Sequence, residues 1–251
     1  MSAAFYNAII TENKKVAEGI YLLTAKGISP MPKAGQFYML RTWAQNEPPL
    51  LSRPISVFDC DNASGTVSFL YEMRGIGTQK LSCAKIGDTL QLTGASGNGF
   101  PTEKLKGKIA LIGGGIGIAP LYLLAKALKA KGCNVELFAG FRDVPYMLDA
   151  FAAQCSAVSL ATDSGNYGTK GFVTDLFNPT GFDAVCICGP EIMMEKAARA
   201  CMEKGVAVYV SKEAKMACGV GACLGCTCKT IGGGKSVCKD GPVFEGSEVY
   251  A

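Results

Sequence analysis

The sequence lacks histidine entirely, and it contains a single tryptophan among 251 residues. Without imidazole there can be no Ser-His-Asp or Cys-His nucleophile, and no His-ligated zinc, proximal-His haem or Rieske centre. Charged residues are also scarce, at 18%, and the formal net charge of +4 is too small to indicate a nucleic-acid partner. The chemistry of this protein must therefore come from other groups.

Long hydrophobic runs are also missing. The apolar stretches are short and interrupted by glycine, so we expect no membrane span. The N-terminus lacks the basic and apolar regions of a signal peptide, which favours a reducing, cytoplasmic location. The chain nevertheless has 12 cysteines. In such a compartment, clustered cysteines are more often metal ligands or redox groups than disulfides. Scattered ones such as Cys60 and Cys133 are expected to be small buried residues.

Length and patterning predict two domains and a short additional segment. Residues 1–102 carry short runs rich in β-branched and aromatic residues, separated by turn residues, which predicts a small antiparallel β-barrel. No helix of convincing length is expected there. The predicted strands fall at 19–25, 35–43, 53–59, 65–74 and 88–94.

Residues 103–211 alternate between apolar strands and periodic helices, which predicts a parallel sheet in an α/β domain. Residues 212–251 have no periodicity and few large side chains, so we expect their cysteines to hold this segment together. The predicted strands are 108–112, 134–142, 156–162, 183–189 and 206–211, and the predicted helices are 120–132 and 191–205.

The strongest motif is a cysteine pattern near the C-terminus. Cys218, Cys223, Cys226 and Cys238 follow the C-x4-C-x2-C…C spacing of plant-type [2Fe–2S] proteins. Small residues between them would let the backbone wrap a cluster. Structural zinc and uncoordinated thiols are the alternatives, although zinc sites usually show two C-x2-C pairs. Cys228 does not fit the pattern, and we interpret it as a spectator.

Two weaker motifs lie in the predicted barrel. Arg53, Pro54, Ile55 and Ser56 combine a guanidinium, which binds phosphate with two hydrogen bonds, with a hydroxyl. Residues 70–78 follow, with Tyr71 able to stack on a ring and Gly77 and Thr78 able to start a helical turn beside a pyrophosphate. The alternative for Arg53 is a solvated surface residue.

Two further motifs lie in the predicted α/β domain. Residues 113–120, GGGIGIAP, join a strand to a helix, as in dinucleotide-binding folds. Pro120 replaces the third glycine, however, and the acidic residue expected further on would be Glu136, within a strand. The alternative is a turn that serves topology alone. Residues 188–191, CGPE, end a later strand, where Cys188 could touch a cofactor or be buried.

Together these motifs resemble the ferredoxin–NADP reductase superfamily, and the C-terminal cysteines resemble those of electron-transfer subunits of two-subunit, NAD-dependent dihydroorotate dehydrogenases. The resemblance implies three cofactors, FAD, NAD and a [2Fe–2S] cluster. The residues it implies are Arg53, Pro54, Ile55, Ser56, Leu70, Tyr71, Glu72, Gly77 and Thr78 for FAD, Gly113, Gly115, Gly117, Cys188, Gly189 and Pro190 for NAD, and Cys218, Cys223, Cys226 and Cys238 for the metal.

The resemblance also implies a partner, an FMN-containing catalytic subunit that oxidises dihydroorotate in pyrimidine synthesis, in a heterotetramer with two copies of each chain. No motif places an acid–base group for a carbon substrate, which favours an electron-transfer component over a complete enzyme. The alternatives are a related reductase that serves ferredoxin, sulfur or hydrogenase partners, and a metal-stabilised binding module without redox activity.

Overall fold

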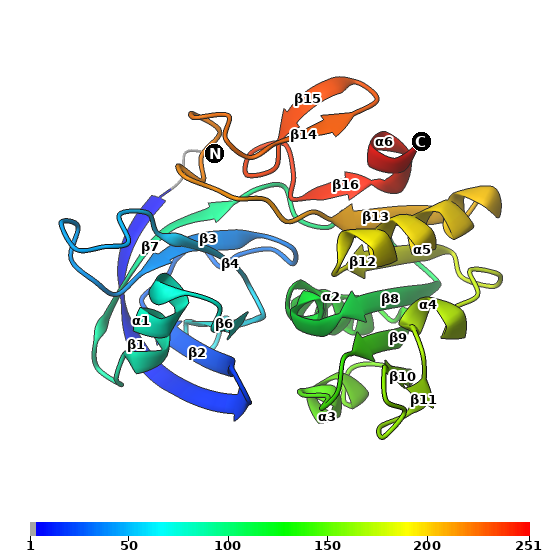
Figure 1. The fold of residues 1–251 in the computed structure, drawn as a ribbon, viewed down its shortest axis with the longest axis horizontal. Coiled ribbons are helices and arrows are strands. Elements are labelled where there is room, and N and C mark those ends of the chain that lie inside the picture. Colours follow the sequence, from blue (N-terminus) through cyan, green and yellow to red (C-terminus); the bar gives the residue numbers. More distant parts are fainter. Residues whose placement is uncertain (1–3) are drawn as a thin grey trace.

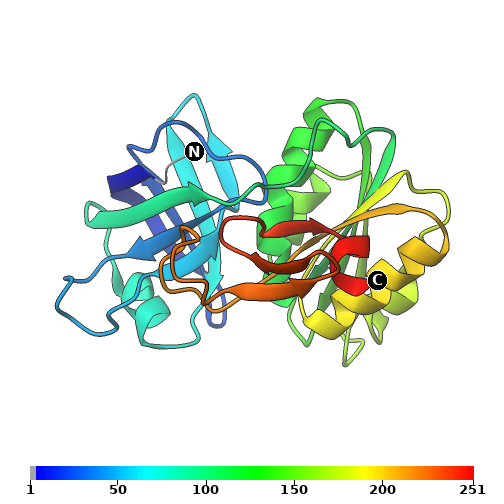
Figure 2. The same cartoon turned by 90° about the horizontal axis from the view of Figure 1, so that it is seen from above.

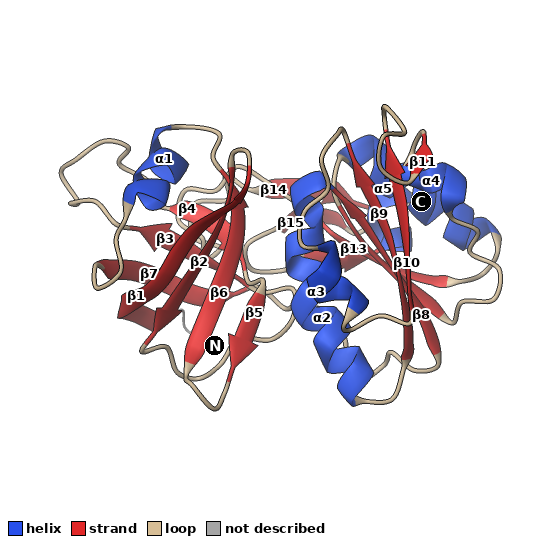
Figure 3. Ribbon diagram, turned by 90° about the horizontal axis from the view of Figure 1, so that it is seen from below, coloured by secondary structure: helices blue, strands red, loops and turns tan. Residues whose placement is uncertain are grey.

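The computed structural model describes residues 4–251, and it shows two lobes with a third element laid across them (Figure 1). Residues 1–3, at the start of the range expected for the flavin barrel, lie outside the described residues. The first lobe is an antiparallel sheet, and the second is a sheet flanked by helices (Figure 3). This architecture confirms the predicted fold class. In the described residues no helix is long and apolar enough to cross a membrane.

The first lobe is a seven-stranded sheet in the order β4-β3-β7-β1-β2-β6-β5. The sheet curls so that β4, at one edge, contacts β6 near the other. Buried residues such as Leu23, Tyr38 and Phe69 fill its interior. The strands are β1 (Ala4–Ala17), β2 (Ile20–Lys26), β3 (Phe37–Arg41), β4 (Arg53–Ser56), β5 (Asp59–Asp61), β6 (Thr66–Glu72) and β7 (Thr89–Ser96).

Two elements of this lobe differ from the sequence prediction. β1 is the longest strand of the lobe and was missed, because its second half, TENKKVA, is polar and lacks the alternation of a half-buried strand. Backbone pairing with both β7 and β2 holds it in place. No helix of convincing length was expected, only a helical turn at Gly77 and Thr78, and that turn continues into the short helix α1 (Ile76–Cys83) after β6. Thr78 closes its first turn, which a hydrophobic pattern does not reveal.

The second lobe has the strand order β11-β10-β9-β8-β12-β13-β16, and all neighbours are parallel except β13 and β16. The purely parallel sheet that we predicted therefore has an antiparallel edge. That edge strand comes from residues 243–245, far along the chain in the cysteine segment. The strands are β8 (Lys108–Gly114), β9 (Asn134–Phe141), β10 (Ala157–Thr162), β11 (Thr169–Lys170), β12 (Ala184–Cys188), β13 (Ala207–Ser211) and β16 (Val243–Glu245).

Helices pack against this sheet, and α2 also faces the first lobe (Figure 3). In α2, Leu121, Leu124, Ala125 and Leu128 are buried at helical spacing, and Pro120 lies in the first turn, as the sequence predicts. The helices of this lobe are α2 (Ala119–Ala130), α3 (Leu148–Ala152), α4 (Val173–Leu176), α5 (Glu191–Glu203) and α6 (Gly246–Tyr250).

Direct contacts fix the two lobes against each other. Phe58 of the first lobe stacks on Tyr122 of α2, with ring centroids 4.4 Å apart and planes 10° apart. Next to this pair, Lys126 Nζ lies 2.9 Å from Asp59 Oδ1. Stacked aromatic rings and a partly shielded ion pair give the boundary a defined geometry. A site with residues from both lobes therefore has a defined geometry.

The cysteine segment lies across both lobes (Figure 2). It contains the hairpin β14 (Thr227–Thr230) and β15 (Gly233–Ser236), and it ends with β16 and α6. We expected little core here, and this was wrong. Val237, Val243 and Phe244 are each less than 5% exposed. Their burial depends on elements far away in the sequence, which the local composition does not show.

Candidate functional site

A cleft of about 240 Å³ opens where the two lobes meet. Its walls come from β4, β6 and the start of α1 on one side, and from the ends of β8, β12 and β13 on the other. The structure thus brings together motifs that are more than a hundred residues apart in the sequence. Lining residues from the predicted site are Arg53, Pro54, Ile55, Ser56, Leu70, Tyr71, Glu72, Thr78 and Cys188.

Only some of the N–H groups of Arg53 have hydrogen-bond partners within the protein. Its Nη2 donates a 2.6 Å hydrogen bond to the carbonyl oxygen of Leu51, but its Nε is buried without a partner among the described residues. A Cβ on Gly77 would come within 2.9 Å of Arg53 Cδ. Glycine at this position therefore leaves space for the arginine. A half-buried arginine that lines a cleft and has a buried donor without a partner fits an anionic group such as a pyrophosphate.

Thr78 and Gly77 lie in the first turn of α1. The Thr78 hydroxyl oxygen accepts hydrogen bonds from the backbone N–H of Arg74 (2.9 Å) and of Gly75 (3.2 Å), and it donates one to the Gly75 carbonyl oxygen (3.1 Å). These bonds fix the entry into the helix. The hydroxyl is thus largely occupied by its own backbone, and the helix N-terminus faces the same region as Arg53.

Tyr71 is 2% exposed and stacks on Tyr21, with ring centroids 5.9 Å apart. This stacking covers one face of its ring. The Tyr71 hydroxyl has no hydrogen-bond partner among the described residues, and burial raises its pKa, so it stays a protonated donor. We expected a ring that stacks on a cofactor, whereas the geometry makes the hydroxyl the group that a cofactor could satisfy. Beside it, Glu72 forms a 2.7 Å ion pair with Arg74.

The two turns of the α/β lobe pack against each other. β8 and β12 are neighbours in the sheet, and the chain leaves them toward opposite sides, which makes this the topological switch point. A Cβ on Gly117 would collide with the Cys188 carbonyl oxygen, and one on Gly189 would come within 3.0 Å of Gly114. The glycines of both motifs are thus needed for close packing at the edge where α/β sheets bind ligands.

Cys188 is 2% exposed, and burial raises the pKa of its thiol, so the thiol remains protonated and neutral. It nevertheless lines the cleft, as does Pro120. Gly113 lies near the end of β8, Gly115 lies in the turn that follows it, and Pro190 precedes α5. Glu136 forms an ion pair with Lys108 over 2.9 Å, so this carboxylate has a structural partner.

The four predicted metal ligands form two pairs of thiols that backbone amides surround. Each sulfur accepts at least one backbone N–H: Cys218 from Val220 and Cys223 (both 3.4 Å), Cys223 from Gly225 (3.5 Å), Cys226 from Cys238 (3.4 Å), and Cys238 from Gly221 (3.0 Å). Such N–H donors stabilise negative charge on sulfur.

The surroundings shift the pKa values of two of these thiols in opposite directions. The Val220 N–H, followed by contributions from Cys223, lowers the pKa of Cys218 to about 6, so this thiol ionises near neutral pH. Burial, followed by the Cys226 side chain, raises the pKa of Cys238 to about 12. Cys218 thus interacts with Cys223, and Cys226 with Cys238.

The arrangement of the donors fits a cluster with two irons, because each iron needs two thiolates. Among the described residues, no three Cys, Asp or Glu side chains converge on a point as they would around one ion. Cys226 and Cys238 are less than 4% exposed, whereas Cys223 is exposed to solvent. The loop therefore has a buried end and an open end. Cys228 lies on β14, and its thiol accepts none of these backbone hydrogen bonds.

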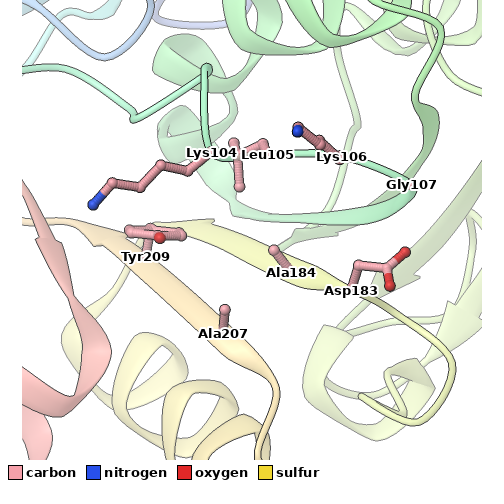
Figure 4. Close-up of a pocket in the computed structure, with 8 residues that line it drawn as sticks. All are labelled: Lys104, Leu105, Lys106, Gly107, Asp183, Ala184, Ala207 and Tyr209. Carbon is pink, nitrogen blue, oxygen red and sulfur yellow. The ribbon is translucent and has the colours of Figure 1, made fainter.

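A second cavity of about 290 Å³ lies at the amino ends of β8, β12 and β13 (Figure 4). Lys104 extends over the ring of Tyr209, while Asp183 points away from both (Figure 4). The cavity is larger than the cleft, but it lies at the opposite edge of the sheet from the switch point. None of the motifs described above contributes to it, and we do not assign the chemistry to it.

Comparisons with known proteins agree with this geometry. Residues 213–250 match the family model described as the iron-sulfur cluster binding domain of dihydroorotate dehydrogenase B. The chain is 50% identical to a Clostridium acetobutylicum protein named dihydroorotate dehydrogenase B (NAD(+)), electron transfer subunit, over 96% of this chain and 95% of that protein. A Clostridium perfringens protein with the same name is 43% identical over 99% of both chains.

The chain belongs to the family of electron-transfer subunits of dihydroorotate dehydrogenase B. It is an oxidoreductase component that transfers electrons, and its cofactors are FAD, NAD and a [2Fe–2S] cluster.

Solved structures support the fold of this family member. A structure titled as the NADH-dependent reduced ferredoxin-NADP oxidoreductase of flavin-based electron bifurcation superposes with a TM-score of 0.86 at 33% identity, covering 97% of this chain and 90% of that one. The ferredoxin reductase of carbazole 1,9a-dioxygenase gives a TM-score of 0.65 at 20% identity, covering 82% and 67%. The second likeness shows the fold alone.

The sequence motifs missed part of the cleft wall. The segment between β13 and the first cluster cysteine contributes Ser211, Lys212, Glu213, Ala214 and Met216, and Pro242 contributes from the other end of the cysteine loop. Glu213 reaches the solvent in the cleft, yet the surrounding protein desolvates its carboxyl and raises its pKa. The position of this segment, directly before Cys218, was the only signal in the sequence.

Proposed function

We propose that the cleft binds the FAD and that the cysteine loop binds the cluster in the residue-by-residue manner described here. When bound, NAD supplies or takes electron pairs, FAD accepts pairs and releases single electrons, and the cluster carries single electrons. Arg53 binds the FAD pyrophosphate through its free Nε and its remaining N–H groups. The Tyr71 hydroxyl donates to the flavin, and Gly77 leaves space for the arginine.

NAD binds at the switch point, with its nicotinamide directed to the cleft. The Gly113, Gly115 and Gly117 turn lies against its phosphates, and Gly189 and Pro190 shape the opposite wall. Cys188 contributes a neutral, buried thiol to the wall of the cleft. A neutral group suits that place, because it neither repels nor traps charge as electrons pass. Cys218, Cys223, Cys226 and Cys238 bind the two irons as thiolates.

One observation supports electron transfer between the flavin site and the cluster site. The segment 211–216 lines the cleft, and after Ala217 it continues directly into Cys218. The flavin site and the metal site are therefore consecutive along the chain and adjacent in space. A short separation is what a one-electron transfer needs. The exposed end of the loop, with Cys223, is the side at which an electron can enter or leave the chain.

The electron-exchange partner is the FMN of a separate catalytic subunit, in a complex with two copies of each chain. When that subunit oxidises dihydroorotate to orotate in pyrimidine synthesis, this chain would take the electrons from the FMN and pass them to NAD. The names of the relatives at 50% and 43% identity support this partner. We place the protein in the reducing cytoplasm, where clustered cysteines serve as metal ligands rather than as disulfides, with neither nucleic acid nor membrane as a partner.

The test compares the isolated chain with the reconstituted pair. The isolated chain should reduce ferricyanide with NADH, because that reaction needs only flavin and nicotinamide. It should not oxidise dihydroorotate with NAD until the FMN-bearing subunit is added, since none of its motifs provides a base for that substrate. Turnover of dihydroorotate by the isolated chain would refute the relay.

A second candidate is a reductase component that serves ferredoxin. The superposition at a TM-score of 0.86 favours it, but the 33% identity of that structure is below the 50% of the relative named for dihydroorotate dehydrogenase. Ferricyanide reduction that the FMN subunit never couples to orotate would support this alternative.

A further inference from the structure

The cysteine loop, residues 218–238, is flanked on both sides by residues that line the flavin cleft. Before the loop, Glu213, Ala214 and Met216 line the cleft, and after the loop Pro242 does so. Figure 2 shows this segment crossing from one lobe to the other. Whatever orders the loop therefore also orders one wall of the cleft.

A single side chain of the first lobe clamps the second end of the loop. Asn98 Nδ2 donates hydrogen bonds to the carbonyl oxygens of Asp240 and Val243, both over 2.9 Å, and its Oδ1 accepts one from the Val243 N–H (3.3 Å). Its backbone N–H donates to the Gly241 carbonyl oxygen (2.7 Å). Four hydrogen bonds thus hold residues 240–243 against the chain that leaves β7.

The two ends of the loop are also linked to each other and to the barrel. The Lys212 N–H donates a 2.8 Å hydrogen bond to the Pro242 carbonyl oxygen. Gly219 packs so closely on Met39 of β3 that a Cβ would overlap the methionine side chain. Met39 and Phe37 share a hydrophobic cluster with Cys226 and Cys238. The metal ligands are thus packed directly onto the flavin lobe.

We propose that Asn98 is a positioning residue that couples the two cofactor sites, so that cluster loading strengthens flavin binding and flavin binding slows loss of the cluster. The proposal rests on the assignment of FAD to the cleft and of the cluster to the loop. Iron binding orders residues 218–238. Because Asn98 holds residues 240–243 in place and Pro242 accepts a hydrogen bond from Lys212, the ordered loop then also fixes Pro242 and segment 211–216 in the cleft wall. Without the clamp, the loop can order around its metal without fixing the cleft wall.

Coupling of this kind is reciprocal, because both ligands act on one equilibrium. The first experiment therefore measures it in both directions with the wild-type chain. FAD dissociation constants are determined by flavin fluorescence for chain with its cluster and after chelator has removed the iron. Release of iron to a chelator is then timed with and without FAD. We expect FAD to bind about tenfold more weakly without the cluster, and iron to leave severalfold faster without FAD.

The second experiment uses Asn98→Asp, which keeps the shape of the side chain but replaces both donated hydrogen bonds with a carboxylate facing two carbonyl oxygens. With the cluster in place, this variant should bind FAD about as weakly as the iron-free wild type, and iron removal should change its affinity less than twofold. Asn62→Asp is the matched control. Asn62 is exposed in the turn between β5 and β6 of the same lobe, and this variant should keep the tenfold dependence.

A purely structural role for Asn98 would lower stability but leave the tenfold ratio intact, and that result would overturn the proposal. Equal FAD affinity of wild-type chain with and without its cluster, together with iron release that FAD does not change, would also overturn it. This arm needs no variant, so it decides the matter even if Asn98→Asp does not fold. A wild-type chain that binds no flavin or no iron would instead refute the proposed function.

Discussion

The cysteine loop and the flavin cleft are built in different ways. The loop draws its four thiols from one stretch between Cys218 and Cys238, and backbone N–H groups of the same stretch donate hydrogen bonds to them. The cleft draws on residues from Phe37 to Pro242 and forms only because two lobes pack together. This difference predicts that loss of the metal disorders the loop and the cleft wall next to it, whereas the rest of the cleft stays formed, because the packing of the two lobes holds it.

The largest effect is expected from the ligand set of the loop. Cys226→Ser should abolish the iron–sulfur absorption, because the remaining three thiolates cannot complete both irons. Cys228→Ser, two residues away, should retain about two irons per chain, since its thiol lies outside the paired sulfurs. Iron analysis and visible spectra measure both. Equal loss from the two variants would mean that the ligand set is wrong.

Removal of the metal should separate the two kinds of site. We expect hydrogen exchange to become fast in residues 218–238, because binding energy at such a site is also folding energy. β16 should stay protected, since it pairs with β13 and buries Val243 and Phe244. The two lobes should also stay folded. Exchange that spreads through β8 and β12 would show that the cluster supports the whole chain.

The largest effect in the cleft is expected at Arg53. Arg53→Ala should weaken FAD binding about 100-fold, because charge-assisted hydrogen bonds from a half-buried guanidinium contribute about 2–3 kcal/mol. Arg53→Lys should weaken FAD binding about tenfold, since an ammonium keeps the charge but not the planar pair of donors. Flavin retention on gel filtration and fluorescence titration measure the change. Full flavin occupancy in Arg53→Ala would make this residue a surface feature.

A smaller effect should follow from crowding Arg53. A Cβ at position 77 lies 2.9 Å from Arg53 Cδ, so Gly77→Ala should displace the guanidinium and weaken FAD binding severalfold. Gly75→Ala is the control, because a Cβ there meets nothing within 4 Å. Each variant adds one methyl group, and the two positions lie two residues apart in the chain. Similar flavin affinities for both would show that the position of Arg53 does not matter.

The same contrast explains what the sequence could predict. The proposed ligands of the loop come from cysteine spacing alone, because a metal site with local ligands imposes a fixed spacing on the sequence. The strands and helices of the α/β lobe follow from periodicity, as α2 and α5 show. β1, the edge strand β16 and the clamp at Asn98 depend on partners far along the chain, so local patterns could not reveal them. Tyr71 was found, but its stacking on Tyr21 was not.

The central claim is that electrons pass directly between a flavin in the cleft and a cluster in the loop of the same chain. Anaerobic titration of the isolated, fully loaded chain with a chemical reductant and with NADH tests it most directly, with flavin and cluster absorption followed separately. The account predicts uptake of about three electrons per chain, two by the flavin and one by the cluster, with NADH bleaching both. Bleaching of the flavin by NADH while the cluster stays oxidised, although the chemical reductant reduces it, would contradict the account.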